Sequence, residues 1–476
     1  MNFVKTFCTL MVCALACASY ASRPMPPEKN FKAFPRVFPV DSTKEITITF
    51  SDETVLDGEG TLQVRFDCEN RRMPGRPGEY LEHWSRGFVP MEFSRKGNTI
   101  TAIFPCGQDE QECRILVEKA DADGNILAEL ASIPVYVLRE DLYALRPFRG
   151  DLHMHSRRSD GSVWAPDILR EARKNGYDFV VISDHYTQAG SQDAAEELKK
   201  LKTNLFTFPG EEISPWDYGT DIHVVAIGAK TGITDRINAN VEAFQKATEE
   251  IEATLPERFD SIVRKQIAAS EVIFNWIREE GGVAVYAHPF WATTGTKIYV
   301  PWEATEELIR RNNFDALEVF TCTSTREATL SESFFNQMRT EGLKTAPFGV
   351  SDAHYHADMS GGFGVNYTIY FAEEPTWESF QKAVKARNTV AVRCMDGHSW
   401  GKSFSKVEDY QYVPERLAGE YRLVKYAEFL LREFYPEHQA ITDRECVDVF
   451  GIEGEGNSWE PVAANTDELW NLFSGK

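Results

Sequence analysis

The chain has 476 residues, of which 42% are hydrophobic and 12% aromatic, and its formal net charge is -22 at pH 7. This is enough apolar material for a substantial core and too long a chain for one ordinary domain, so we expect two or three folded units. The negative charge argues against a surface that binds nucleic acid, because such surfaces are basic. A small anionic substrate is compatible with it if metal ions supply local positive charge.

The first residues have the pattern of a secretory signal peptide, predicted at 1–21. Lys5 precedes an apolar run at 7–18, and the small residues at 19–21 fit a cleavage site. No later segment approaches the ~20 apolar residues of a membrane helix. We therefore predict a secreted or periplasmic protein without a transmembrane segment. The alternative is a lipid anchor on Cys17, although Ala14 stands where a lipoprotein signal usually carries Leu.

Residues 22–140 have the pattern of a small β-sandwich domain. Turn residues separate short alternating runs at 45–50, 61–67, 98–104 and 134–139. Three aromatic residues here fit either a platform for carbohydrate or a protein partner, or ordinary core packing: Tyr80, Trp84 and Phe88. The domain could also do no more than shield the edge of the domain that follows.

The chain has nine cysteines, and six remain after the predicted signal peptide is removed. Disulfides persist in exported proteins. Candidates for one bridge are Cys68, Cys106 and Cys113. No spacing indicates a zinc-thiolate site, and we expect three others to be buried apolar residues, namely Cys322, Cys394 and Cys446.

From residue 141 to 396 short apolar strands alternate with helices. A helix is predicted at 166–175, and strands at 178–183, 222–228, 283–287, 317–320 and 345–350. This alternation predicts parallel βα units. The mostly polar helical segment at 231–280 is longer than a simple crossover and is interpreted as an insertion that can cap the site. Residues 397–476, partly helical at 414–434, are interpreted as an extension.

Histidine is scarce, with ten in the chain, yet seven lie between His153 and His356 where a predicted strand ends or has just ended. Strand ends are where α/β folds place their sites. In the first cluster, Gly-Asp-Leu-His-Met-His followed by Ser-Asp-Gly, His153 and His155 project to the same face of an extended segment and can hold one cation, with Asp160 returning from the loop. Two unrelated surface histidines are the alternative for this pair taken alone.

Five further motifs follow. A buried strand ends in Asp184-His185, where the histidine can bind a metal and the aspartate can orient it. In Pro-Gly-Glu-Glu, at 209–212, one carboxylate can bridge two metals. His223 heads an apolar strand, and taken alone is more typical of a core histidine than of a ligand. Another strand ends at His288, and a last motif places Asp352 and His354 two residues apart on one face.

These six motifs, in this order, resemble the PHP (polymerase and histidinol phosphatase) superfamily of metallohydrolases. The resemblance covers residues 149–392, and the leading motif is most similar to the carbaryl-hydrolase-like (CehA/McbA) branch. It implies a distorted (β/α)7 barrel of the PHP type with two or three divalent metals at the carboxyl ends of the strands.

The resemblance also implies which residues bind each metal. The first metal would be held by His153, His155, Glu212 and Asp352. Glu212 would bridge to a second held by His223 and His288, and a third would be held by Asp160, His185 and His354. The motif Pro-Gly-x-Glu favours Glu212 over Glu211, which becomes a supporting or surface residue. Some relatives carry His in place of Asp160. Glu318 is expected to contact a histidine.

The expected chemistry is hydrolysis by a hydroxide generated between metals. Three divalent cations against the carboxylates of Asp160, Glu212 and Asp352 leave a surplus of about three positive charges, which suits hydroxide and a phosphate dianion. These carboxylates and His354 are the residues expected to take part in catalysis. Imidazole and carboxylate ligands fit Zn, Mn or Fe.

Substrate contacts are predicted only from position along the chain. Arginine side chains could clamp phosphate oxygens, or lie in solvent; the residues considered are Arg157, Arg158, Lys297 and Arg326. Phe290 and Trp291 could wall the pocket. The remaining histidines are interpreted as ordinary polar residues: His83, His356, His398 and His438.

Three functions are compatible with this sequence. The first is a phosphoesterase acting on a small phosphate ester. The second, favoured by the branch resemblance and the aromatic pair at 290–291, is a hydrolase of carboxylic or carbamate esters. The third is a catalytically silent binding protein, which the complete set of nine ligands argues against, because a decayed site loses several.

Overall fold

The computed structural model describes residues 30–68, 88–214, 222–292, 300–321, 325–354, 364–393, 416–450 and 462–476. It divides into two compact units, Met1–Arg139 with Leu472–Lys476, and Glu140–Asn471. The predicted signal peptide lies outside the described residues. Within those residues, none of the helices combines the length and apolar character that a membrane crossing requires.

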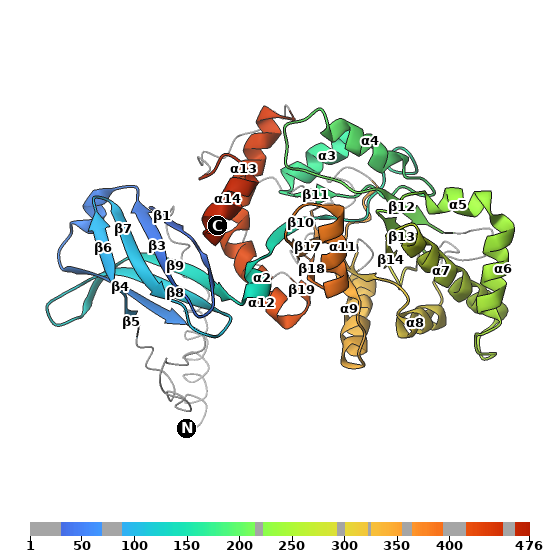
Figure 1. The fold of residues 1–476 in the computed structure, drawn as a ribbon, viewed down its shortest axis with the longest axis horizontal. Helices are drawn as coiled ribbons and strands as arrows, with labels where there is room; N and C mark the ends of the chain where they lie inside the picture. The colour runs from blue at the N-terminus through green and yellow to red at the C-terminus, as the bar shows by residue number, and fades with distance from the viewer. Residues whose placement is uncertain are drawn as a thin grey trace, which may run out of the picture. The chain divides into compact units, whose positions relative to one another are not determined.

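The first unit consists of β-strands in two sheets (Figure 1). The strands are β1 (Phe31–Phe34), β2 (Val37–Pro39), β3 (Thr43–Phe50), β4 (Thr61–Cys68), β5 (Val89–Pro90), β6 (Phe93–Lys96), β7 (Thr99–Pro105), β8 (Gln111–Ala120) and β9 (Ile126–Leu138). One sheet has the order β1-β3-β7-β6 and the other β2-β9-β8-β4-β5. Alternate residues of both sheets, such as Ile48, Ile100, Val117 and Ile133, face one apolar core. This is the layering of a β-sandwich.

One disulfide joins neighbouring strands of this unit. Cys68 on β4 and Cys113 on β8 lie opposite each other in the ladder and form the bridge. Cys106 is buried and free. The prediction of one bridge among the three cysteines is therefore confirmed. Of the proposed aromatic platform, Tyr80 and Trp84 lie outside the described residues.

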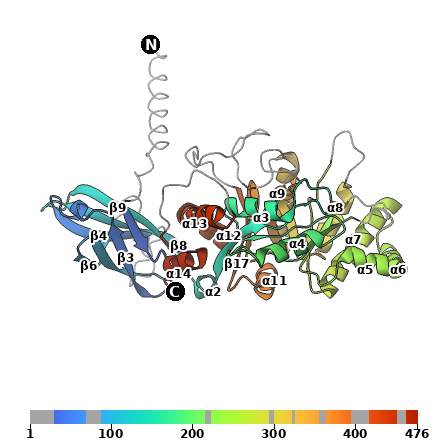
Figure 2. The same cartoon turned by 90° about the horizontal axis from the view of Figure 1, so that it is seen from above.

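The second unit is a mixed α/β fold with two five-stranded sheets (Figures 1 and 2). The strands are β10 (Arg146–Asp151), β11 (Phe179–Val180), β12 (Gly210–Ile213), β13 (Val224–Ile227), β14 (Val283–Tyr286), β15 (Ala316–Phe320), β16 (Ala346–Gly349), β17 (Asn366–Ala372), β18 (Thr389–Arg393) and β19 (Arg416–Gly419). The sheet orders are β11-β10-β17-β18-β19 and β12-β13-β14-β15-β16.

Helices follow most of these strands. From residue 140 onward they are α2 (Glu140–Tyr143), α3 (Ala165–Lys174), α4 (Ala189–Leu198), α5 (Ile233–Ala239), α6 (Val241–Glu252), α7 (Ser261–Glu279), α8 (Trp302–Arg311), α9 (Thr325–Thr340), α11 (Trp377–Ala386), α12 (Tyr421–Glu433), α13 (Tyr435–Asp448) and α14 (Thr466–Ser474). Their boundaries follow local chemistry. The Asp260 carboxylate caps α7 by accepting from the backbone N–H groups of Ile262 and Val263.

The two sheets curl around a shared apolar core. Inward side chains from both sheets, including Phe148 on β10, Val285 on β14, Phe348 on β16 and Tyr370 on β17, pack in one cluster. The opposite face of β13 to β15 packs against α7 and α8. This is a curled, half-barrel arrangement. The closed (β/α)7 barrel stays a prediction.

The predicted parallel pairing is confirmed for only some of the strands. β14, β15 and β16 are parallel neighbours, as are β10 and β11, but β13 is antiparallel to both β12 and β14. β17 is antiparallel to β10 and β18. No helix is described between β12 and β13, and a parallel pair needs such a crossover. The apolar runs predicted the strands but contained no signal of their direction.

The segment 231–280 is helical as expected, and its role as a cap over the site stays a prediction. In Figure 2, α5, α6 and α7 lie together at one end of this unit. The buried face of α7, including Ile267 and Phe274, packs with Ala284 and Tyr286 on the outward face of β14. This helix therefore supports the sheet from the side opposite the shared inner core.

A candidate metal centre

The nine predicted ligands lie at one end of the strands of the second unit. His153 and His155 follow β10, and Asp160 lies in the turn after them. His185 follows β11, Glu212 lies on β12, His223 precedes β13, His288 follows β14, and Asp352 and His354 follow β16. The antiparallel direction of β13 explains the position of His223. Because β13 runs opposite to β14, the start of β13 meets the end of β14, and His223 comes next to His288.

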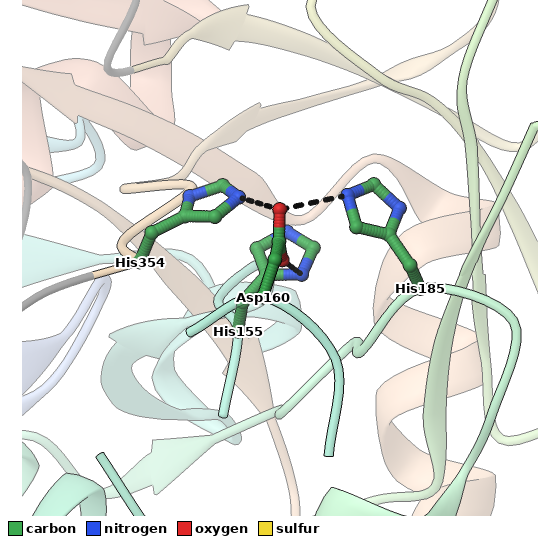
Figure 3. Close-up of side chains that lie close together, drawn as sticks. All are labelled: His155, Asp160, His185 and His354. Carbon is green, nitrogen blue, oxygen red and sulfur yellow. Dashed lines mark ion pairs between the residues drawn. The ribbon is translucent and has the colours of Figure 1, made fainter. Parts of the chain in front are cut away.

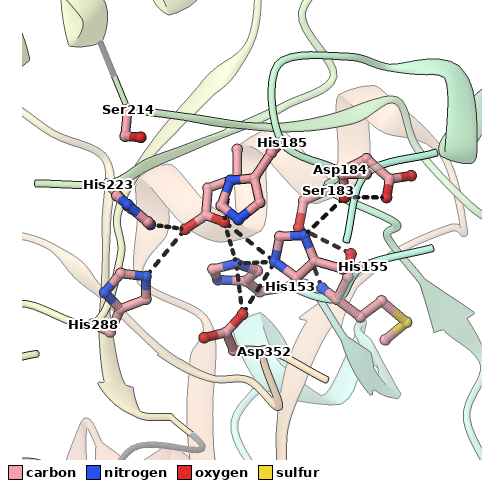
Figure 4. Close-up of polar contacts among 12 residues, drawn as sticks. His153, His155, Ser183, Asp184, His185, Ser214, His223, His288 and Asp352 are labelled. Carbon is pink, nitrogen blue, oxygen red and sulfur yellow. Dashed lines mark hydrogen bonds and ion pairs between the residues drawn. The ribbon is translucent and has the colours of Figure 1, made fainter. Parts of the chain in front are cut away.

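Glu212 is the centre of the cluster. Its Oε1 lies 2.8 Å from His223 Nδ1 and 3.0 Å from His288 Nε2. Its Oε2 lies 3.2 to 3.3 Å from one nitrogen each of His153, His155 and His185. Figure 4 shows these five histidines pointing toward a common centre. One buried carboxylate thus contacts five imidazole rings.

Two aspartates complete the cluster on either side of His155. Asp352 Oδ1 lies 3.1 Å from His155 Nε2 and 3.3 Å from His153 Nε2. Asp160 Oδ1 lies 3.7 Å from His155 Nδ1, while its Oδ2 lies 3.7 Å from His185 Nε2 and 3.4 Å from His354 Nε2, as Figure 3 shows.

The ligand atoms form three overlapping groups, each with its atoms within 4.8 Å of one another. The groups are His153, His155, Glu212 and Asp352; His155, Asp160, His185 and His354; and His185, Glu212 and His223. The first is the predicted first-metal set. The second contains the predicted third-metal set with His155 added. The third has His185 where His288 is predicted, although both histidines contact Glu212.

The donor atoms fit divalent cations. Coordination at about 2.0–2.2 Å puts neighbouring ligand atoms on one cation ~3 Å apart, the spacing found around Glu212. His153 Nε2 and His155 Nε2 face each other at 3.2 Å, an approach of two nitrogens that needs a proton or a cation between them. His223 Nε2 and His288 Nδ1 are buried and have no hydrogen-bond partner among the described residues.

Burial gives the centre a closed side and an open side. The side chains of His153, His155 and Glu212 are at most 1% exposed. Those of His185 and Asp352 are 19% and 20% exposed, and that of Asp160 is 57% exposed. A substrate would therefore approach over the aspartates and His185.

The buried carboxylates favour the protonated, positively charged form of a histidine in the cluster. Burial alone would lower the pKa of His155, but Asp352 and Glu212 outweigh it and raise that pKa to about 9. Burial opposes the charge of Glu212, yet His153 and His223 hold its pKa well below the usual value. Burial lowers the pKa of His185 to about 4. The acids are thus ionised, and divalent cations would supply the charge that protons otherwise provide.

Two buried acids support the ligands, one as expected and one not. Glu318 Oε1 lies 2.6 Å from His153 Nδ1, and its Oε2 accepts a hydrogen bond from the backbone N–H of His288. Asp184 was expected to orient His185. It instead accepts hydrogen bonds from Ser156 N and Oγ and from Ser159 Oγ, at 2.6 to 2.7 Å. It therefore holds the turn that carries Asp160.

Glu211 is neither a ligand nor a surface residue. Its side chain is buried and accepts hydrogen bonds from the backbone N–H groups of Ile233 and Thr234, at 2.6 and 3.1 Å. These are the first residues of α5, where a carboxylate is stabilised by the helix dipole. The adjacent glutamates thus face opposite sides of β12, because side chains alternate along a strand.

The predicted substrate contacts do not converge on the centre. Arg158 binds the Asp193 carboxylate through two nitrogens, at 2.7 and 3.0 Å. Arg157 Nε donates to the backbone oxygen of Ser162, and Arg326 is exposed at the start of α9. Lys297 lies outside the described residues. Their role in substrate binding stays a prediction.

The two aromatic residues expected to wall the pocket lie in different environments. Phe290 is buried against Trp302 and Phe334 and does not wall the centre. Trp291 packs its ring against His223 and His288, with centroids 5.1 Å away from each.

The remaining histidines have separate outcomes. His438 is buried and lies 2.8 Å from Asp178 Oδ1 through Nε2, so it is a structural residue. His83, His356 and His398 lie outside the described residues.

Sequence reasoning missed three residues beside the centre. They are Ser156, Ser159 and Tyr186. The two serines follow His155 in a turn, and their place just after the His-Met-His motif was the only signal available. Tyr186 has a positive φ of 62°, rare for a residue other than glycine, and Asp352 has 50°. Such backbone conformations cluster at functional sites, but sequence does not reveal them.

No protein-family model matches this chain. The chain is 32% identical over 84 residues to a phosphoribosyl 1,2-cyclic phosphate 1,2-diphosphodiesterase from Eggerthella lenta, which is 17% of this chain and 31% of that protein. It is 35% identical over 77 residues to a 5'-3' exoribonuclease from Haemophilus influenzae, 16% of this chain and 27% of that protein. The matches span less than a third of either relative. They are consistent with the PHP-like resemblance, but neither concerns the CehA/McbA branch.

Two solved structures are also similar. One, from Bifidobacterium adolescentis, is provisionally described as a metal-dependent phosphoesterase; it is 19% identical, with a TM-score of 0.31 over 50% of this chain and 96% of that chain. The other is an amidohydrolase from Chromobacterium violaceum, 18% identical, with a TM-score of 0.32 over 51% and 97%. At these TM-scores the likeness carries no argument about function.

Proposed function

We propose that this protein is a metal-dependent hydrolase of the PHP type, acting on a phosphate ester at a di- or trinuclear site. The observation that carries the proposal is the position of Glu212, one buried carboxylate in contact with five histidines. A carboxylate with both oxygens directed at separate imidazole groups is the arrangement that bridges two cations. The local sequence similarity to a phosphodiesterase and an exoribonuclease supports phosphoester chemistry.

The nine ligands would be shared among the cations. His153, His155, Glu212 and Asp352 hold the first, and Glu212, His223 and His288 the second. Asp160, His185 and His354 hold the third. Divalent cations there would supply a hydroxide nucleophile at neutral pH and neutralise charge on the phosphate oxygens. Zn, Mn or Fe suit these donors.

The protein's own residues set the charge and shape of this centre. Glu318 fixes the ring orientation of His153, and Asp184 fixes the turn that carries Asp160. Asp160, Asp352 and His354 lie on the open side, where they can contact substrate as well as metal. With three divalent cations, the three carboxylates leave a surplus of about three positive charges, which attracts a phosphate dianion. This positive charge would be local to the centre, on a chain whose formal net charge is -22 at pH 7.

A second function, hydrolysis of a carboxylic or carbamate ester, is favoured by the branch resemblance and by one observation. The Trp291 ring lies against His223 and His288, which gives the second metal group an apolar neighbour. Greater activity on aryl esters than on aryl phosphates would select this function.

The export of the chain and the domain boundaries 22–140, 141–396 and 397–476 also stay proposals.

The test begins with protein purified without chelator. Elemental analysis is expected to find two or three divalent metals per chain, and turnover of a panel of aryl phosphates, phosphodiesters and aryl esters should follow metal content. Chelation should abolish turnover, and Zn or Mn should restore it. Fewer than one metal per chain after metal loading, or inertness on all three substrate classes, would contradict the proposal.

A further inference from the structure

Two aromatic side chains adjoin ligand histidines of the candidate metal centre. The Tyr186 ring lies 5.7 Å from the His185 ring, at an interplanar angle of 32°. The Trp291 ring lies 5.1 Å from the His223 ring, at 57°. His185 and His223 belong, with Glu212, to one of the three ligand groups, and their rings are 5.5 Å apart. The two aromatic rings therefore lie beside neighbouring ligand histidines, Tyr186 at the proposed third-metal set and Trp291 at the second.

Tyr186 is held in place on the open side. Its backbone N–H donates to the backbone oxygen of Glu212 at 2.9 Å, and its hydroxyl hydrogen-bonds with Ser214 Oγ at 2.7 Å. These contacts hold a left-handed backbone conformation, which is unfavourable for tyrosine. The side chain is nevertheless 37% exposed. An exposed aromatic ring fixed beside His185 has the properties of a binding surface.

Trp291 is anchored in a different way. Its backbone N–H donates to the backbone oxygen of His288, and its backbone oxygen accepts from Val300 N. The side chain is half-buried against the core formed by β13, β14 and α7. Its ring packs on the ligand histidines His223 and His288, so these residues fix its position before a substrate binds.

The geometry points to a substrate-specificity subsite formed by Tyr186 and Trp291, which takes a planar group attached directly to the ester oxygen. This inference rests on the proposed function and names the substrate class. A phosphate bound at the cations would hold its ester oxygen beside the ligand histidines, and a planar group on that oxygen would meet the two rings. Aromatic rings pack favourably on planar groups through stacked and edge contacts. A nucleobase separated from phosphate by ribose would extend past them.

Binding of two matched phosphonates tests the inference without turnover. In phenylphosphonate and methylphosphonate a phenyl or a methyl group takes the place of the ester oxygen and its substituent, so the pair compares a planar ring with a small non-planar group. Calorimetry on metal-containing protein measures both dissociation constants. The unaltered protein is expected to bind phenylphosphonate about tenfold more tightly. Tyr186→Leu and Trp291→Leu should each reduce this preference about threefold or more, whereas Tyr186→Phe and Trp291→Phe, which keep a ring, should retain most of it.

Matched controls come from aromatic residues away from the centre. Tyr421→Leu and Trp302→Leu remove partly exposed rings that contact no ligand histidine among the described contacts, and should keep the full preference. Each variant must have the metal content of the unaltered protein, which separates loss of a ring from loss of a cation. Adenosine 5'-monophosphate should bind equally to the unaltered protein and both leucine variants.

The outcomes separate the inference from the function on which it rests. If metal-containing protein binds neither phosphonate and hydrolyses no ester, both fail. If it binds both phosphonates equally, or if the leucine variants keep the preference, the subsite is wrong and the proposed function stands. If adenosine 5'-monophosphate depends on the two rings as strongly as phenylphosphonate, direct attachment of the planar group is wrong.

Discussion

Glu318 Oε1 lies 2.6 Å from Nδ1 of His153, so a buried carboxylate holds the ring whose other nitrogen points at Glu212 and Asp352. The same glutamate accepts a hydrogen bond from the backbone N–H of His288. It therefore ties together two strand ends that each carry a predicted ligand. Carboxylates in this position fix the tautomer of the histidine and raise its basicity toward the metal.

We predict that Glu318→Gln weakens metal binding without removing a ligand. Loss of such a partner typically costs 10- to 100-fold in affinity, and competition with a chromogenic chelator measures it. The matched control is Glu271→Gln, since Glu271 is also buried but bonds to Asn313, away from the centre. Equal affinities for the unaltered protein and Glu318→Gln would show that the contact does not act on the metal.

Asp184→Asn is expected to reduce metal occupancy at one position only. The variant weakens the hydrogen bonds to Ser156 and Ser159, and the turn that carries Asp160 loses its anchor. The group formed by Asp160, His185 and His354 should therefore lose its cation, while the sites around Glu212 keep theirs. Elemental analysis should find about one metal fewer per chain. Asp167→Asn, which alters an exposed pair with Arg170, serves as the control. Uniform loss at all sites would contradict the assignment.

A second buried network controls stability at acid pH. Burial opposes the charge of Asp178, but His438, Arg146 and Arg173 outweigh it and lower the pKa of Asp178 to about 2. A carboxyl group with a pKa below its unfolded value stabilises the fold above pH ~4 and loses that contribution as pH falls toward 2. Burial lowers the pKa of His438, so this partner is largely neutral at pH 7 and adds its charge only in acid. The contribution of Asp178 at pH 7 is therefore at most on the order of 2 kcal/mol.

Asp178→Asn should accordingly lower the free energy of unfolding by at most about 2 kcal/mol at pH 7. The difference from the unaltered protein should narrow between pH 4 and pH 3. Urea unfolding followed by tryptophan fluorescence at pH 7, 4 and 3 measures it. A difference that stays constant over this range would mean that the charge of Asp178 does not contribute to stability.

The sequence could place the candidate ligands at strand ends, where the structure brings them together, because each lies close to a short apolar run. Asp-His after a buried strand placed His185, and two residues at a spacing of two placed His153 with His155. Such local patterns can be recognised in the sequence whether the strands pair in parallel or antiparallel. The motif resemblance favoured Glu212 over Glu211 but gave no physical reason for the choice. The alternation of side chains along β12 decides that, sending one to the metal centre and the other to α5.

Other features depend on contacts between distant segments and had no local signal. The direction of β13 follows from its connections and not from its apolar residues. Asp184 faces Ser156 and Ser159 instead of His185 because the end of β11 lies beside the turn after β10. Arg158 could not be assigned from sequence either, since its partner Asp193 is 35 residues away on α4.

The adjacent glutamates Glu212 and Glu211 provide the most direct test of the metal centre. Elemental analysis of Glu212→Gln and Glu211→Gln, both purified without chelator, compares two neighbours of identical chemistry. We predict that Glu211→Gln keeps the two or three metals of the unaltered protein, with at most a loss of stability at α5, whereas Glu212→Gln loses most of its metal. Full metal content in Glu212→Gln, or equal loss in both variants, would contradict a centre built around Glu212.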